Sequence, residues 1–154
     1  MRSGGSIRWR GVGAGALAAA LTVFLLSPMV RGLYDILTGS LAPMGKLTSG
    51  LIVVALVSGF LAYLFGGFVA GRLARGAGGA NGAMTAVMGT AVGALLGAVG
   101  IAVSGNVWVA IMNLGSAGLA VLIGLLLLLI DLFGGYIGGK LGEPSEPRMH
   151  RLHD

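Results

Sequence analysis

The chain has 154 residues, of which 56% are hydrophobic and only 10% charged, and its net charge is +5. A soluble domain carries about 25% charged residues, so this composition indicates a membrane protein. The lack of cysteine excludes disulfides and zinc–thiolate sites, and the lack of a basic face with interleaved aromatic residues argues against nucleic-acid binding.

The first apolar segment follows residues 1–10, a basic stretch without acids that we predict to be a cytoplasmic N-terminus. It predicts a transmembrane helix over about 12–33, which Pro28 should kink near its far end. Cations followed by an apolar run also occur in signal peptides, but no small-residue cleavage site follows here, so we favour an uncleaved helix. Arg31 and Asp35 are within reach of each other on one helix face, but we expect two separate charges facing water.

Three further apolar segments predict helices over about 47–71, 81–103 and 115–140. Each is long enough to cross a bilayer, since about 20 helical residues span its hydrocarbon core. Residues 143–154 are polar, contain two prolines, and are predicted to form a mobile cytoplasmic tail. The whole chain, 1–154, is predicted to be a single all-α membrane domain.

The cations predict the orientation of the four spans. Eight of the ten Lys and Arg residues lie in the N-terminal segment, the second connection and the C-terminal end, and two lie in the first and third connections. Because cytoplasmic segments carry the excess of cations, both termini are predicted to be cytoplasmic. The membrane-flanking cations singled out are Arg8, Arg10, Arg72, Arg75 and Lys140.

An internal repeat relates the two halves of the chain. Residues 64–73 read Leu-Phe-Gly-Gly-Phe-Val-Ala-Gly-Arg-Leu and residues 132–141 read Leu-Phe-Gly-Gly-Tyr-Ile-Gly-Gly-Lys-Leu, with six of ten positions identical. Each copy ends the second helix of a two-helix hairpin, and both hairpins would insert in the same orientation. We therefore predict two tandem parallel hairpin repeats, related by an axis along the membrane normal.

Many glycines recur at a spacing of four residues, which places them on one face of a helix. Such faces let helix backbones approach closely in a membrane. Packing of the four helices on one another, in the manner of a glycine zipper, is one interpretation, and the surplus of glycine faces leaves a homo-oligomer open as another. The predicted helix-packing residues are Gly67, Gly71, Gly89, Gly93, Gly97, Gly134, Gly135, Gly138 and Gly139.

The paired Gly-Gly-aromatic motif in a four-helix chain resembles a group of small bacterial integral membrane proteins of unknown function. The resemblance implies four spans and a bacterial cytoplasmic membrane. It supplies no catalytic or binding residues.

Two intramembrane polar residues stand out. Asp131 is the one acid inside a predicted span, where a charge costs about 2.5–3.5 kcal/mol, so it is a functional candidate, although we favour structural pairing. The repeat offset places Tyr63 at the equivalent position. We predict that both side chains point into the bundle at similar depth, with the phenol donating to the carboxylate.

Three functions compete, and none is enzymatic, since no hydrolytic set, phosphate loop or metal site is present in the spans and no cofactor is implied. A structural or assembly protein, with the lipid bilayer around it and no protein partner indicated, is favoured because the spans hold few polar groups. The alternatives are a membrane-bound regulator that uses the cationic side, or a small transporter or channel with Asp131 in a proton or cation path. The further residues proposed to line such a path are Ser58, Tyr63, Thr85 and Thr90.

Overall fold

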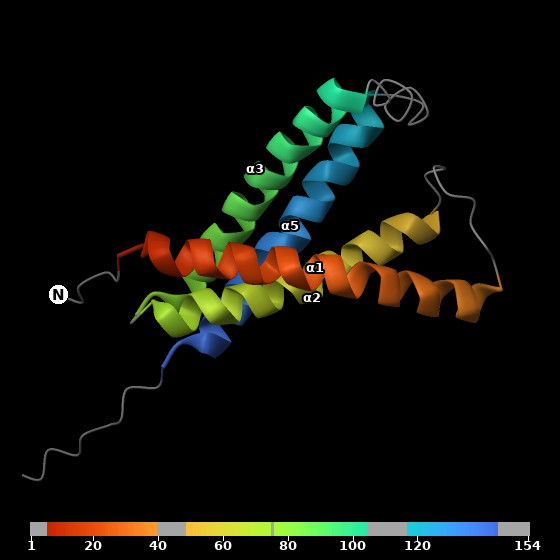
Figure 1. Ribbon diagram of the computed structural model, residues 1–154. Helices are drawn as coiled ribbons and strands as arrows, with labels where there is room; N and C mark the ends of the chain where they lie inside the picture. The colour runs from red at the N-terminus through yellow and green to blue at the C-terminus, as the bar shows by residue number, and fades with distance from the viewer. Residues whose placement is uncertain (1–5, 40–48, 75, 105–116, 145–154) are drawn as a thin grey trace, which may run out of the picture.

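The computed structural model describes residues 6–39, 49–74, 76–104 and 117–144. These ranges form four α-helices, shown in Figure 1: α1 (Trp9–Thr38), α2 (Ser49–Leu73), α3 (Gly78–Ser104) and α5 (Ala117–Gly142). All four are long and apolar enough to cross a membrane. The prediction of an all-α, multi-pass membrane protein is confirmed in the number, length and apolar character of its helices.

The first helix extends beyond both of its predicted ends. It continues through Pro28 and stops where Gly39 takes a left-handed conformation, with φ 63° and ψ 12°. A glycine adopts this conformation without steric cost, which is why it ends helices so often. At its start, Arg8 is extended and lacks a side-chain cap of its own.

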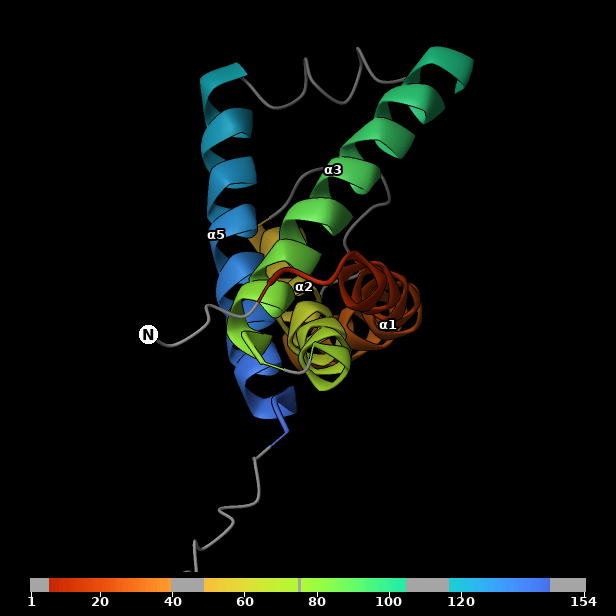
Figure 2. The same cartoon turned by 90° about the vertical axis from the view of Figure 1, so that its left-hand side faces the viewer.

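The helices form two arms that meet at one end. The start of α1, the end of α2, the start of α3 and the end of α5 lie together, whereas the α1–α2 and α3–α5 arms point apart at the other end (Figure 1). Figure 2 looks along α1 and α2 and shows that α3 and α5 also separate toward their outer ends. We call the shared end the convergent end and the other the outer end.

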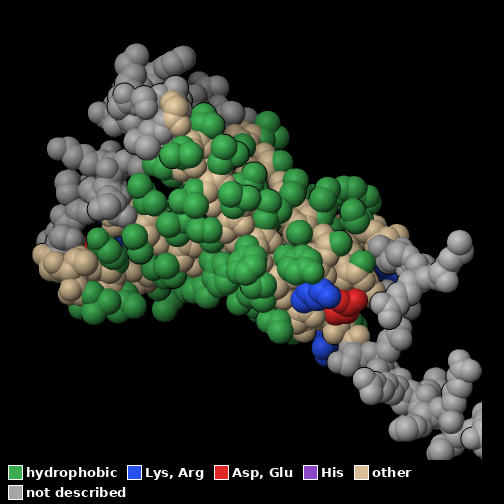
Figure 3. All heavy atoms as spheres, turned by 180° about the vertical axis from the view of Figure 1, so that it is seen from behind, with side chains coloured by type: hydrophobic (Ala, Val, Ile, Leu, Met, Phe, Trp, Pro, Cys, Tyr) green, Lys and Arg blue, Asp and Glu red, His purple; other side chains and the backbone are tan. Residues whose placement is uncertain are grey.

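The core at the convergent end consists mostly of small side chains. The largest fully buried side chains are only Val12, Asn81 and Thr85. Large hydrophobic side chains are instead exposed: Phe24 is 79% and Ile36 80% exposed. Figure 3 shows hydrophobic side chains over most of one face, with charged side chains gathered toward one end. Such a surface suits a hydrocarbon solvent.

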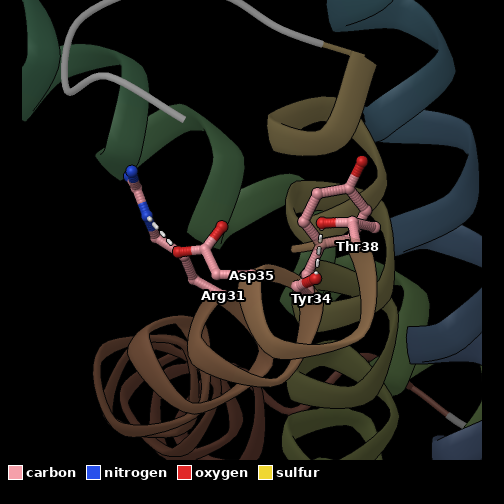
Figure 4. Close-up of polar contacts among 4 residues, drawn as sticks. All are labelled: Arg31, Tyr34, Asp35 and Thr38. Carbon is pink, nitrogen blue, oxygen red and sulfur yellow. Dashed lines mark hydrogen bonds and ion pairs between the residues drawn. The ribbon is translucent and has the colours of Figure 1, made fainter. Parts of the chain in front are cut away.

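The outer end of α1 carries a small polar cluster, drawn in Figure 4. Arg31 Nε lies 3.8 Å from Asp35 Oδ2, so the expectation of two separate charges facing water is wrong. The Thr38 hydroxyl donates to the backbone carbonyl of Tyr34 at 2.8 Å. The Tyr34 ring packs on Gly50 of α2, where a Cβ would lie 2.6 Å from the phenol oxygen. This contact joins α1 to α2 far from the convergent end.

Candidate functional site

The contact between α2 and α5 joins equivalent positions of the repeated motif. A Cβ placed on Gly67 would collide with the carbonyl oxygen of Gly135, and a Cβ on Gly71 with that of Gly139. Both pairs advance by four residues in the same direction, so α2 and α5 run parallel. Only glycine allows backbones this close, because real Cβ atoms essentially never approach other atoms within 3.0 Å.

The same contact is close when viewed from α5. A Cβ on Gly134 would lie 2.8 Å from the Phe60 carbonyl oxygen, and one on Gly138 would collide with the Leu64 carbonyl. Carbonyl oxygens this near a glycine Cα accept weak Cα–H···O contacts, which recur at membrane helix interfaces. Gly67 and Gly71 of α2 thus lie against backbone carbonyls of α5, and Gly134 and Gly138 of α5 lie against backbone carbonyls of α2.

Each hairpin is also closed by a glycine pair. Gly15 of α1 and Gly66 of α2 approach reciprocally, and a Cβ on either would lie 2.5 Å from the other's carbonyl oxygen. Gly82 of α3 and Gly135 of α5 approach reciprocally as well. Gly135 therefore touches both α2 and α3.

On α3, neither Gly89 nor Gly93 lies against the backbone of another helix in the described chain. A Cβ on Gly89 would lie 2.5 Å from the Tyr63 hydroxyl oxygen, so an aromatic side chain rather than a backbone covers this glycine. A Cβ on Gly93 would meet no described atom within 4 Å, so the packing role expected of Gly93 stays a prediction. The surroundings of Gly97 lie outside the described residues.

Gly93 faces a groove between α1 and α3 of about 460 Å³. Tyr63 of α2 contributes the phenol that lies against Gly89, and nearly all the rest of the lining is apolar. The groove is lined by Gly13, Ala16, Leu17, Ala20, Val23, Phe24, Tyr63, Met88, Gly89, Val92, Gly93 and Leu96.

Tyr63 and Asp131 turn toward different helices, Tyr63 toward α3 and Asp131 toward α2. Each precedes by four residues a member of the Gly67·Gly135 pair, so both lie one helical turn from the same contact. The Tyr63 hydroxyl lies against Gly89 of α3. Asp131 Oδ1 instead lies against Gly59, where a Cβ would be 2.6 Å away. Within the described part of the chain this buried oxygen has no hydrogen-bond partner. The expected phenol–carboxylate bond to this oxygen is therefore not formed.

Sequence reasoning overlooked Asn81, which is fully buried at the convergent end. Its Oδ1 accepts a hydrogen bond of 2.7 Å from the backbone N–H of Arg8, and its Nδ2 donates to the Ala77 carbonyl at 3.0 Å. Asn81 thus caps the start of α1 from another helix, since the first N–H groups of a helix have no partner within it. The available signal was a lone amide at the start of an otherwise apolar helix.

The other buried polar side chains bond within their own helices. The Ser58 hydroxyl donates to the Val54 carbonyl at 2.5 Å, and the Thr85 hydroxyl to the Asn81 carbonyl at 3.0 Å. Such local bonds satisfy a hydroxyl without lining a path. Among the described residues, no group of three His, Cys, Asp or Glu side chains is placed to hold a metal ion.

Four of the five flanking cations lie near the convergent end on exposed positions: Arg8, Arg10, Arg72 and Lys140. Arg75 and most of the C-terminal tail lie outside the described residues. No protein-family model, curated protein or solved structure matches this chain. The resemblance to small bacterial membrane proteins therefore stays a prediction, while four long apolar helices agree with its four spans.

Proposed function

We propose that the chain is a non-enzymatic membrane scaffold made of two parallel hairpin repeats that are joined at their glycine motifs. The observation that carries the proposal is the contact of Gly67 with Gly135 and of Gly71 with Gly139, equivalent positions in the two motifs. A packed, mostly apolar junction serves assembly better than it serves chemistry, since it presents few groups able to bind or transform a polar substrate.

The hairpin crossings support the repeat. The first hairpin closes at Gly15 and Gly66, and the second at Gly82 and Gly135. These pairs correspond to within one residue under the offset that relates the two motifs. Two units of similar sequence thus close in a similar way, as parallel repeats about an axis along the membrane normal would.

The charges support a cytoplasmic location for the convergent end. Arg8, Arg10, Arg72 and Lys140 lie there, and the Arg31–Asp35 pair lies near the outer end. Cytoplasmic ends carry the excess of Lys and Arg, so both termini are proposed to face the cytoplasm of a bacterial cell. A homo-oligomer stays a prediction.

Asp131 Oδ1 is buried without a hydrogen-bond partner among the described residues, which favours a second candidate, a small transporter with this carboxyl in a proton or cation path. The scaffold is preferred because the hydroxyls of Ser58 and Thr85, two proposed lining residues, donate hydrogen bonds to carbonyls of their own helices. Purified protein reconstituted into dye-loaded liposomes separates the two. A scaffold gives the same proton and cation leak as empty liposomes, and a flux that Asp131→Asn abolishes would establish the transporter instead.

A further inference from the structure

A cationic pocket lies at the start of α1. It has a volume of about 450 Å³ and is lined by Arg8, Trp9, Arg10, Gly11 and Leu73. The side chains of both arginines are exposed, and Trp9 is 62% exposed. The ion pair found within the described residues joins Arg31 to Asp35, so neither pocket arginine is neutralised by an acid of the described chain.

The pocket's place in the fold identifies the ligand chemistry. The first residues of α1 stand at the boundary of an apolar span, and tryptophan is enriched at the level of lipid headgroups. Arginine binds phosphate through paired N–H groups. Basic pockets between transmembrane helices bind the headgroups of anionic lipids.

A separate apolar groove lies farther along α1, and Trp9 of the pocket is on the helix face that lines it. Trp9, Gly13, Ala16, Ala20 and Phe24 are spaced three or four residues apart, so they share a face. Apart from Trp9, all of them line the groove of about 460 Å³ between α1 and α3. Because α1 spans the bilayer, the cationic pocket meets the headgroup layer and the groove meets the hydrocarbon.

A charged end and an apolar length together fit an amphiphile better than a second copy of the chain. A second copy inserts in the same orientation, so its own arginines would stand at the level of Arg8 and Arg10 and repel them. An anionic lipid brings the opposite charge to that level and a flexible chain to the groove.

We propose that α1 and α3 hold one anionic phospholipid, with its phosphate at Arg8 and Arg10 beside Trp9 and one acyl chain in the groove. The proposal does not depend on the scaffold function. The binding site would make a lipid part of the folded unit at its cytoplasmic end.

Native mass spectrometry of the full chain, extracted from membranes with equal phosphatidylglycerol and phosphatidylcholine, tests this site. The wild type should retain one phosphatidylglycerol with at least about a tenfold preference, the factor that one charge-assisted contact supplies. Arg8→Gln with Arg10→Gln should abolish the preference. Lys140→Gln, which removes an exposed cation near the same membrane end but outside the pocket, should keep it.

A second pair of variants tests the groove. Gly93→Trp should prevent lipid retention by filling the groove, whereas Gly124→Trp on α5 should not. At both glycines, no described atom lies within 4 Å of the Cβ position. Excess inorganic phosphate should leave the lipid bound, because free phosphate cannot fill the groove. Rising salt should reduce the preference of the wild type for phosphatidylglycerol over phosphatidylcholine. This measurement uses the wild type alone, so it does not depend on whether a variant folds.

Several results would overturn the proposal. They are equal retention of the two lipids by the wild type, displacement by inorganic phosphate, an equal effect of Lys140→Gln, or lipid retention by Gly93→Trp. A lipid-free dimer of the wild type that dissociates in Gly93→Trp would show that a second copy occupies the groove.

Discussion

Gly135 offers the sharpest test of the glycine junction, because it touches two helices at once. In Gly135→Ala the new Cβ would collide with the Gly82 carbonyl oxygen and lie 3.1 Å from the carbonyl carbon. Ordinary van der Waals contact begins at 3.4 Å. Restoring it at the oxygen requires α3 and α5 to part by about 1 Å, and a gap of that size forfeits roughly a quarter to a half of each neighbouring dispersion contact.

The expected loss follows from these distances. Overpacking a well-packed site costs about 1–3 kcal/mol, and alanine's better helix propensity returns up to about 1 kcal/mol. Gly124→Ala is the matched control, since Gly124 lies in the same helix with nothing within 4 Å of its Cβ position. The propensity term is common to both variants, so Gly135→Ala should be less stable than Gly124→Ala by about 1–3 kcal/mol.

Unfolding by sodium dodecyl sulfate in mixed micelles, followed by helical circular dichroism, measures this difference. Each variant is compared at the same micelle composition so that only the substitution differs. Equal midpoints for Gly135→Ala and Gly124→Ala would refute the argument that backbone contact at Gly82 and Gly135 holds α3 to α5.

Four further predictions concern other parts of the chain. Reporters fused after residue 78 and at the C-terminus should read cytoplasmic and one at residue 43 external, and an external C-terminus would contradict four spans. Asn81→Ala should cost about 1–3 kcal/mol in the same unfolding assay, because it removes the part-buried acceptor of the Arg8 N–H and leaves that donor unpaired. Thr85→Val should cost less than about 1 kcal/mol, and the reverse order would exclude the cap. Asp131→Asn should stabilise the protein by about 1 kcal/mol at neutral pH, because an amide avoids placing a charge in the span; a clear loss of stability would reveal a partner for the carboxylate. Gly93→Leu in lipid-free detergent should be tolerated as well as Gly124→Leu, and selective unfolding of the former would mean that the groove is filled by protein.

Hydropathy and spacing alone predicted the four helices and several of the residues at their contacts. The motif glycines were identified because a spacing of four residues places them on one face, and the crowding at Gly71 and Gly139 is of the kind expected there. The same rule also selected Gly93, which meets open space. Spacing reports which residues share a face, and it cannot report whether a helix, a side chain or lipid covers that face.

Spacing along the sequence also leaves the direction of a side chain undetermined. The offset between the motifs relates Tyr63 to Asp131, and each residue lies one helical turn before the Gly67·Gly135 contact. It did not predict that the phenol would turn toward Gly89 and the carboxylate toward Gly59. Those directions depend on the rotation of each helix about its own axis, which is set by contacts with the other three helices.

The two-armed shape follows from the distribution of side-chain size along α5. From Gly134 to Gly139 the helix presents four glycines, and there its backbone touches those of α2 and α3. From Leu125 to Leu129 it presents only leucines, two of which are at least 53% exposed. In lipid no hydrophobic force closes such a gap, because acyl chains are as apolar as leucine. The outer ends are therefore free to part once the glycines have fixed the convergent end, and the apolar surface that this exposes is available to lipid and to partners within the membrane.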